Sequence, residues 1–352
     1  MGDASTGPGT PAPGGAPRGR LRRRWIALAG IVVVGIVAAV AVWGVAGYLA
    51  YDQLSTVHTG CASREFAAQT PADFEAYDGD HSLTVDTAPY RFTDYTDVAF
   101  PSRDPSLTIR GWYAPGPGGV AAPTVIVVHG RDSCRRDPVV MLPAAMLHRA
   151  GFGVLMIDLR NHGDSDSDNG RWAGGAKEYR DVLGAWDWLV AQGADPVRIG
   201  LFGASLGAGT ATIATGEEPR VAATFADSSY YSFDVASSEY TESQGYPAWV
   251  VPAGILVGRL LGETELGSRD PASEIVRLAG RPFDIVHGLS DTTILPHNAV
   301  ELAAAAYAAG TSVEPWIIPG AEHTQGMLLR PGDYEARLVA FFRGALGDPT
   351  VR

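Results

Sequence analysis

The sequence predicts an α/β fold: a mostly parallel central sheet with helices on both faces and an inserted cap, preceded by one transmembrane helix. Short apolar runs, such as residues 124–128 and 154–158, have no polar face and are typical of strands inside a parallel sheet. Amphipathic helical segments alternate with these runs, as expected when helices cover a parallel sheet. An uncharged stretch, residues 25–51, lies near the N-terminus. We therefore expect one globular α/β domain and one membrane helix.

The composition limits the classes of protein to which the chain can belong. Its 352 residues are 46% hydrophobic and 19% charged, enough for one large core with an appendage. The formal net charge is -12, whereas binding to nucleic-acid phosphates requires a basic face. We therefore exclude nucleic acid as a partner.

Residues 1–24 form a basic tail before the apolar stretch. Up to about Arg20 this tail is rich in Gly, Pro, Ala, Ser and Thr, so we expect it to be disordered. Its first residues, Met1 to Thr6, match the pattern for myristoylation, which Pro/Gly-rich tails often match. The tail also carries five arginines: Arg18, Arg20, Arg22, Arg23 and Arg24. Because positive charge stays on the cytoplasmic side of a membrane, the tail is expected to be cytoplasmic.

The stretch from Trp25 to Tyr51 is expected to be a signal-anchor helix that crosses the cell membrane once. As a helix it exceeds the roughly 30 Å thickness of the hydrocarbon layer. Everything after Asp52 then lies outside the cytoplasm. The alternative is a cleaved signal peptide with a cut near Val45-Ala46-Gly47, although the apolar core of such peptides is usually only about 7 to 15 residues long.

The remaining elements follow in order along the chain. Residues 52–94 show no clear period and are expected to form a connecting segment with short helical pieces around Ser63 to Tyr77. Residues 95–348 are expected to form the globular domain, which begins with a hairpin over 95–113. Further strands are expected at 124–128, 154–158, 198–202, 221–226, 282–287 and 313–318, and helices at 141–149, 176–192, 206–215, 298–309 and 333–346. Residues 227–280 interrupt this alternation and are expected to form the cap.

One turn of the predicted sheet carries a candidate nucleophile. Ser205 lies between the strand that ends at Phe202 and the helix that begins at Leu206, within the sequence Gly203-Ala204-Ser205-Leu206-Gly207. A Gly-x-Ser-x-Gly spacing is typical of a nucleophile elbow, because side chains at the two glycine positions would collide with the neighbouring strand and helix. The helix that follows directs its first amides toward the same point.

Other motifs accompany this turn in a fixed order: His129-Gly130, then residues 158–165, 287–291 (His-Gly-Leu-Ser-Asp) and 321–323 (Ala-Glu-His). In this order they resemble the α/β-hydrolase superfamily, and most of all its branch of serine-aminopeptidase-like and dienelactone-hydrolase-like esterases. The resemblance extends from about Tyr95 to the C-terminus. It implies the α/β-hydrolase fold and a triad in the order Ser, acid, His, which is Ser205, Asp291 and His323 in this chain.

Each predicted catalytic residue has a chemical role. His323 would remove the proton of Ser205 as the serine attacks, and Asp291 would hold the other nitrogen of that histidine. Asp227, at the end of the strand after the elbow, is the competing acid, since some members of the superfamily carry the acid there. The backbone amide of Leu206 is expected to bind the oxyanion, and the resemblance implies the amide of Arg131 as the second donor.

Several other residues that could carry chemistry are expected to be structural. His129, His287 and His162 lie at strand ends or in a loop that the resemblance treats as structural, and Cys134 has no elbow of its own. Residues 164–170 resemble the start of a calcium loop, but Asn169 replaces the required glycine and Gly175 replaces the glutamate. Cys61 and Cys134 are either bridged or two independent thiols.

The motifs together predict a serine hydrolase that acts through an acyl-enzyme, without a metal or cofactor. The expected substrate is a small-molecule ester, and an amide or a thioester is the less favoured alternative. Acyl transfer to an alcohol or amine is the second enzymatic alternative. A binding protein on the same fold is the alternative from another class.

The cap is predicted to shape the substrate site. Residues 246–258 carry no charge, so they must bury their side chains in the core, at the bilayer surface or over Ser205. In the last arrangement Trp249, Ile255 and Leu256 would line an apolar acyl pocket.

Overall fold

The computed structural model describes residues 1, 7, 9, 18–57, 61–263 and 265–349. The chain divides into two compact units, Met1–Ala46 and Gly47–Arg352. The expected disorder of the tail concerns residues that lie largely outside the described ones. The myristoylation pattern of Met1 to Thr6 also lies outside them, apart from Met1.

The first unit consists mainly of the long helix α1 (Arg18–Ser55), whose last residues, from Gly47 onward, belong to the second unit. At 1.5 Å per residue its 38 residues extend over about 57 Å, well beyond the thickness of a bilayer core. Within the described residues it is the one helix long and apolar enough to cross a membrane. It begins at Arg18 and not at Trp25, because arginine is a good helix former and continues the helix into the basic segment.

The second unit is built on an eight-stranded sheet with the strand order β10-β9-β8-β7-β5-β6-β4-β3. Its strands are β3 (Thr96–Pro101), β4 (Thr108–Ala114), β5 (Thr124–Val128), β6 (Gly153–Asp158), β7 (Ile199–Ala204), β8 (Ala223–Asp227), β9 (Phe283–Gly288) and β10 (Trp316–Ile318). β4 pairs antiparallel with β3 and β6, and the other pairs are parallel. The predicted α/β-hydrolase fold with a mostly parallel sheet is confirmed.

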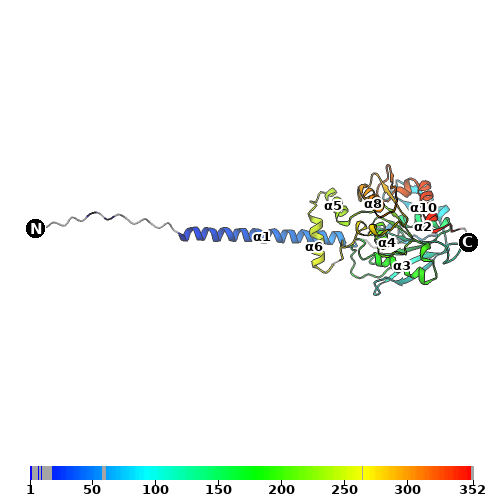
Figure 1. The fold of residues 1–352 in the computed structure, drawn as a ribbon, viewed down its shortest axis with the longest axis horizontal. Helices are drawn as coiled ribbons and strands as arrows, with labels where there is room; N and C mark the ends of the chain where they lie inside the picture. The colour runs from blue at the N-terminus through cyan, green and yellow to red at the C-terminus, as the bar shows by residue number, and fades with distance from the viewer. Residues whose placement is uncertain (2–6, 8, 10–17, 58–60, 264, 350–352) are drawn as a thin grey trace. The chain divides into compact units, whose positions relative to one another are not determined.

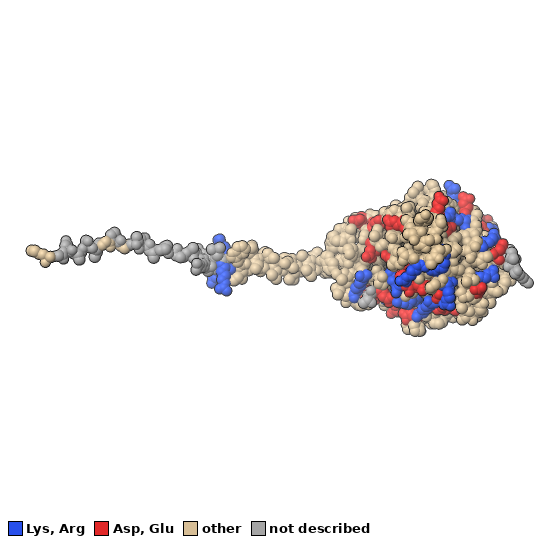
Figure 2. Space-filling view, in the orientation of Figure 1, with Lys and Arg blue, Asp and Glu red and all other residues tan. Residues whose placement is uncertain are grey.

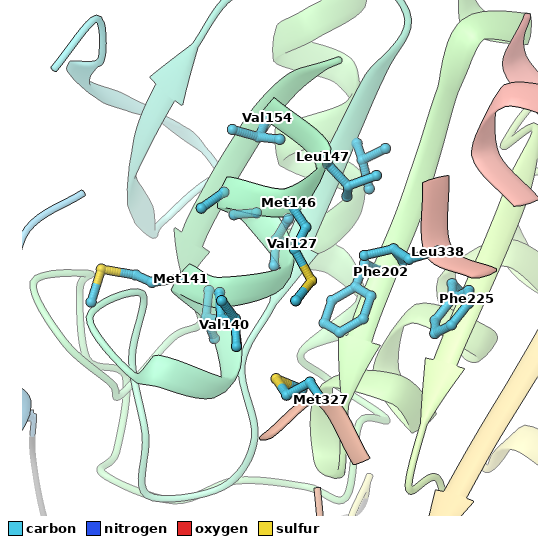
Figure 3. Packing of buried hydrophobic residues seen from close by; sticks show 14 of the residues in the cluster. Val127, Val140, Met141, Met146, Leu147, Val154, Phe202, Phe225, Met327 and Leu338 are labelled. Atoms are coloured by element: carbon cyan, nitrogen blue, oxygen red, sulfur yellow. The ribbon is translucent and has the colours of Figure 1, made fainter. Parts of the chain in front are cut away.

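Helices cover both faces of this sheet. One face carries α2 (Pro138–Arg149) and α10 (Pro331–Leu346), and the other carries α3 (Tyr179–Ala191), α4 (Leu206–Glu217) and α8 (His297–Ala308). Figure 1 shows helices α2, α3, α4, α8 and α10 of the second unit. Successive side chains of β5 point to opposite faces, so Val127 joins the core beneath α2 and Ile126 joins the core beneath α3. Figure 3 shows the first of these cores, where Phe202 and Phe225 of the sheet lie near Leu338 of α10.

The expected cap lies between β8 and β9. It contains α5 (Phe233–Ser243), α6 (Val250–Leu260), α7 (Pro271–Glu274) and the 3-10 turn η5 (Ile275–Arg277). Its apolar side chains form a separate cluster with the end of α1 and with the elbow: Tyr51, Trp172, Leu206, Tyr230, Phe233, Ala236, Val251, Ile255 and Leu266.

The segment between α1 and β3 packs against the domain. It holds the short 3-10 turns η1 (Cys61–Ser63), η2 (Glu65–Ala68) and η3 (Ala88–Tyr90), and the two-stranded sheet of β1 (Ala76–Tyr77) and β2 (Thr84–Val85). Phe74 is fully buried in the core beneath α2. Cys61 and Cys134 form a disulfide with a Cα–Cα distance of 5.7 Å. The bridge, which the sequence left open, therefore joins this segment to the loop after β5.

Candidate active site

Ser205 lies on a strained turn between β7 and α4. Its backbone has φ 55° and ψ −121°, in a region that residues with a side chain rarely adopt. A Cβ at Gly203 would clash with the carbonyl of Gly207, and a Cβ at Gly207 would clash with the carbonyl of Val128. The amide of Ser205 donates to the carbonyl of Asp227 at 2.9 Å. The two glycines therefore let strand and helix approach closely enough to form the predicted elbow.

The structure brings Ser205, His323 and Asp291 into one line of hydrogen bonds. Nε2 of His323 lies 2.8 Å from Oγ of Ser205, and its Nδ1 lies 2.7 Å from Oδ2 of Asp291. An ionised carboxylate only accepts hydrogen bonds, so Nδ1 carries the proton. Nε2 is then the acceptor for the serine hydroxyl. This is the arrangement that lets a histidine act as the base for a serine nucleophile.

Asp291 is held by four donors. Its Oδ1 accepts the amides of Thr293 and Ile294, both at 2.9 Å, and its Oδ2 accepts from His323. Nε2 of His287 lies 2.8 Å from the carbonyl oxygen of Ile294 and 3.2 Å from Oδ2 of Asp291. Because a carbonyl only accepts, that nitrogen carries a proton and shares it with the carboxylate.

These donors determine the charge of Asp291. Burial alone would raise the pKa of the Asp291 carboxyl, but the hydrogen bonds from His287 and His323 outweigh burial and lower the pKa well below its ordinary value. The carboxylate is therefore ionised at neutral pH and holds the proton of His323 on Nδ1. The contact from His287 was not predicted, although the spacing of four residues between His287 and Asp291 was visible in the sequence.

The competing carboxylates have other partners. Asp227 accepts from the hydroxyl of Tyr334 at 2.7 Å and from that of Ser228 at 2.9 Å. Burial raises the pKa of Asp227, against the effect of these hydrogen bonds. Asp284, inside β9, pairs with Arg337 at 2.6 Å. Of Asp227, Asp284 and Asp291, it is Asp291 that hydrogen-bonds to His323.

The two amides predicted to bind the oxyanion belong to Leu206, next to Ser205, and to Arg131, next to Gly130. Leu206 follows the nucleophile at the N-terminus of α4, and Arg131 follows Gly130, where a Cβ would lie 3.3 Å from Cβ of Ser205. Among the described residues neither amide donates to a protein acceptor. Both are therefore available to a ligand on Ser205.

Two buried histidines hold the loop that contains Arg131. Nδ1 of His129 donates to the carbonyl of Gly130 at 2.7 Å, and Nε2 of His162 accepts the amide of Asp132 at 3.3 Å. Burial lowers the pKa of both imidazoles. They are thus neutral and structural at neutral pH.

Comparison with known proteins identifies the family. Residues 139–349 match the model of the prolyl oligopeptidase family, a match that covers both the elbow and His323. The chain belongs to the prolyl oligopeptidase family. The family and the fold together support the function of a serine hydrolase.

This prolyl oligopeptidase-family chain is similar to proteins that are named as an esterase, a transferase and an uncharacterised protein. An esterase from Pyrococcus furiosus has the same fold, with 23% identity and a TM-score of 0.58 over 75% of this chain and 94% of that one. An uncharacterised protein of Mycobacterium tuberculosis is 34% identical over 119 residues, which are 33% of this chain and 39% of the relative. A polyketide transferase of Aspergillus fumigatus is 30% identical over 146 residues, 41% and 48% of the two chains. The chain thus spans less than half the length of these two relatives.

In this member of the family the side chain of Arg131 connects the site to the end of α1. Its Nη2 donates to the carbonyls of Gln53 at 2.7 Å and Thr56 at 3.3 Å, and its guanidinium lies 5.0 Å from the centre of the Trp172 ring. The sequence had indicated a role for the Arg131 amide alone. The sequence does not reveal this contact of the Arg131 side chain, because Arg131 and Gln53 are 78 positions apart.

The three residues of the predicted acyl pocket differ in their exposure to solvent. Ile255 is buried in the cluster that contains Leu206, as a lining residue should be. Trp249 and Leu256 are instead 45% and 47% exposed. Helical geometry explains the difference, since Leu256 is adjacent to Ile255 and points to another side of α6. The lining of an acyl pocket by these three side chains stays a prediction.

The aspartates of the calcium-like segment are engaged by the protein. Asp164 pairs with Arg135 and Arg136 at 2.6 and 2.7 Å, and Asp166 accepts the amide of Thr108 at 2.8 Å. Among the described residues no group of three or more His, Cys, Asp and Glu side chains is arranged to hold a metal ion.

Proposed function

We propose that the chain is a membrane-anchored serine hydrolase that cleaves esters through an acyl-enzyme. The observation that carries this proposal is the hydrogen-bonded line from Ser205 through His323 to Asp291. Oγ of Ser205 attacks the ester carbonyl while its proton passes to Nε2 of His323. The amides of Leu206 and Arg131 stabilise the negative oxygen of the tetrahedral intermediate.

The second half of the cycle reuses the same groups. His323 returns the proton to the leaving alcohol, which leaves an acyl group on Ser205. A water molecule then attacks the acyl carbonyl as His323 takes its proton. The bond between the acyl carbon and Oγ of Ser205 breaks, the acid is released, and His323 returns the proton to Oγ. These steps use groups of the chain and water, so the proposed reaction involves no metal or organic cofactor.

The proposal is tested with a panel of acyl esters of graded chain length, together with matched amides and thioesters. We expect ester cleavage to be the fastest reaction and the free acid to be the main product, even when an alcohol acceptor is added. The likeness to a polyketide transferase makes acyl transfer the second candidate. A product that is mainly the acylated acceptor would favour transfer, and an absence of turnover on every ester would favour a binding protein.

Arg131 is a positioning residue in this proposal. We expect Arg131→Met to lower kcat by about tenfold with little change in KM, because the loop amide loses its anchor but remains present; loss of a whole oxyanion donor costs more. Arg171→Met is the matched control. Arg171 contacts the same end of α1, through Ser55 and Asp52 at 2.8 Å, but not the oxyanion loop. Equal losses of kcat in the two variants would show that Arg131 acts only through general stability.

We further propose that the catalytic unit lies outside the cytoplasm and the tail inside. The arginines before residue 25 support this orientation, and a disulfide is typical of an oxidising compartment. Protease added to intact spheroplasts should digest the catalytic unit and spare a tag fused to the tail. Protection of the catalytic unit would reverse the topology, and full activity in the medium would favour a cleaved signal peptide.

A further inference from the structure

Helix α6 has apolar residues on two opposite sides. The inner side, with Val251, Gly254, Ile255 and Gly258 at helical spacing, is buried against the rest of the second unit. The outer side carries Trp249, Pro252, Leu256 and Leu260, also at helical spacing, and all four are exposed. Leu260 is 76% exposed and the adjacent Leu261 is 59% exposed. We call Trp249, Leu256, Leu260 and Leu261 the outer stripe.

The outer stripe lacks the charged residues that normally cover a water-facing helix. Between Glu242 and Glu263 the one charged residue is Arg259. Its guanidinium turns back to the carbonyls of Leu266 and Gly267, at 3.2 and 3.3 Å. In Figure 2 Lys, Arg, Asp and Glu are distributed over much of the rest of the visible surface of the globular unit. A contiguous exposed apolar surface of this kind indicates a partner that excludes water.

The neighbour of α6 indicates which partner this is. A Cβ at Gly47 of α1 would lie 2.9 Å from Val257, and a Cβ at Gly254 of α6 would lie 2.9 Å from the amide of Tyr51. The two helices therefore touch through glycines, within the second unit. Tyr48 and Leu49 of α1 are exposed beside this contact. The apolar surface of the end of α1, from Gly47 onward, thus continues onto α6.

We infer that the outer stripe of α6 lies in the surface of the lipid bilayer. The inference rests on the proposed membrane anchor. Helices of this kind bury one apolar side at the boundary of headgroups and acyl chains, where tryptophan is also favoured. Such helices usually have a polar side that faces water. In α6 the corresponding side is apolar because it packs against the domain. Because Ile255 on the inner side shares a cluster with Leu206, α6 separates the bilayer from the candidate oxyanion site. The substrate class that fits is an ester of an amphiphile held in the membrane.

The chain permits a direct test with a fluorescent probe. Its two cysteines are joined in a disulfide, so Leu260→Cys introduces a single free thiol. Val197→Cys is the matched control. Val197 is 64% exposed and lies just before the start of β7, whereas Ser205 follows the end of the same strand. The full chain, labelled with an environment-sensitive probe, is placed in phosphatidylcholine vesicles. We expect doxyl-labelled lipid to quench the probe at position 260 and aqueous iodide to quench the probe at position 197.

The outcomes separate this inference from the anchor on which it rests. A chain that floats with the vesicles but exposes both probes equally to iodide would overturn the inference and leave the anchor intact. A chain that does not float with the vesicles would overturn the anchor, and the inference with it.

A second test measures ester cleavage by variants of the outer stripe. We expect Leu260→Glu to lower cleavage of a long-chain ester embedded in vesicles severalfold, and to leave cleavage of a water-soluble short-chain ester unchanged. Val197→Glu should change neither. Equal rates of Leu260→Glu and Val197→Glu on the embedded ester would contradict a role of the outer stripe.

Discussion

Replacement of Ser205 by alanine is expected to remove about a millionfold of turnover, and His323→Ala should cost about as much, because serine and base act as a unit. The hydrogen bond of 2.8 Å between them is the structural reason. Each loss is measured as kcat on the best ester of the panel. Double replacement should cost little more than either change alone, which distinguishes a shared catalytic unit from two independent contributions.

The acid provides an internal comparison. Asp291→Asn should cost less than loss of the serine, on the order of 10⁴-fold, since the amide disturbs the tautomer of His323 but leaves the nucleophile in place. Asp227→Asn should reduce stability more than kcat, because its carboxylate contacts Tyr334 and Ser228 instead of the base. A larger loss of kcat for Asp227→Asn, with both variants folded, would move the acid to β8.

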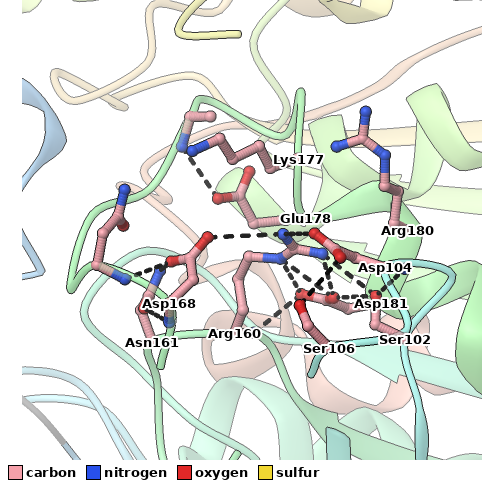
Figure 4. Close-up of polar contacts among 12 residues, drawn as sticks. Ser102, Asp104, Ser106, Arg160, Asn161, Asp168, Lys177, Glu178, Arg180 and Asp181 are labelled. Atoms are coloured by element: carbon pink, nitrogen blue, oxygen red, sulfur yellow. Dashed lines mark hydrogen bonds and ion pairs between the residues drawn. The ribbon is translucent and has the colours of Figure 1, made fainter. Parts of the chain in front are cut away.

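The largest effect on stability is expected from the buried ion pair of Arg160 and Asp181. Arg160 and Asp181 are both nearly inaccessible, and the guanidinium donates to the carboxylate at 2.8 to 3.2 Å (Figure 4). Asp181 also accepts the hydroxyl of Ser102 at 2.7 Å. Asp181→Asn leaves a buried cation without its main partner, so we expect it to cost about 3–5 kcal/mol of the free energy of unfolding. Urea denaturation of the detergent-solubilised chain measures this change.

An exposed pair is the control for this prediction. Arg330 and Asp333 are 3.6 Å apart and both largely exposed. Because such surface pairs contribute little, Asp333→Asn should cost less than about 1 kcal/mol. Similar midpoints for Asp181→Asn and Asp333→Asn would show that the buried pair does not stabilise the fold.

The parts of the site that the sequence predicts well are those with a local physical cause. The two elbow glycines appear in the sequence because any larger side chain would clash with backbone. Strands such as β5 appear as unbroken apolar runs because both faces of the sheet are covered. The order of Ser205, Asp291 and His323 follows from the resemblance, and the structure brings these side chains into hydrogen-bonding distance.

The parts that the sequence does not predict depend on distant contacts. The disulfide and the contact from Arg131 to Gln53 each join segments more than 70 positions apart. Helix α6 is apolar on both sides, so its period does not show that Ile255 is buried whereas Trp249 and Leu256 are exposed. Helix α1 extends beyond the apolar stretch at both ends, since hydropathy reports the span and not the helix.

Labelling with a fluorophosphonate probe, followed by mass spectrometry of the peptides, tests whether Ser205 is an activated nucleophile. An activated serine reacts with this probe, whereas an ordinary surface serine does not. We expect a single adduct on Ser205 in the full chain, and no adduct in Ser205→Ala or His323→Ala. An adduct on another residue, or a Ser205→Ala variant that still takes the label and keeps its turnover, would contradict this expectation.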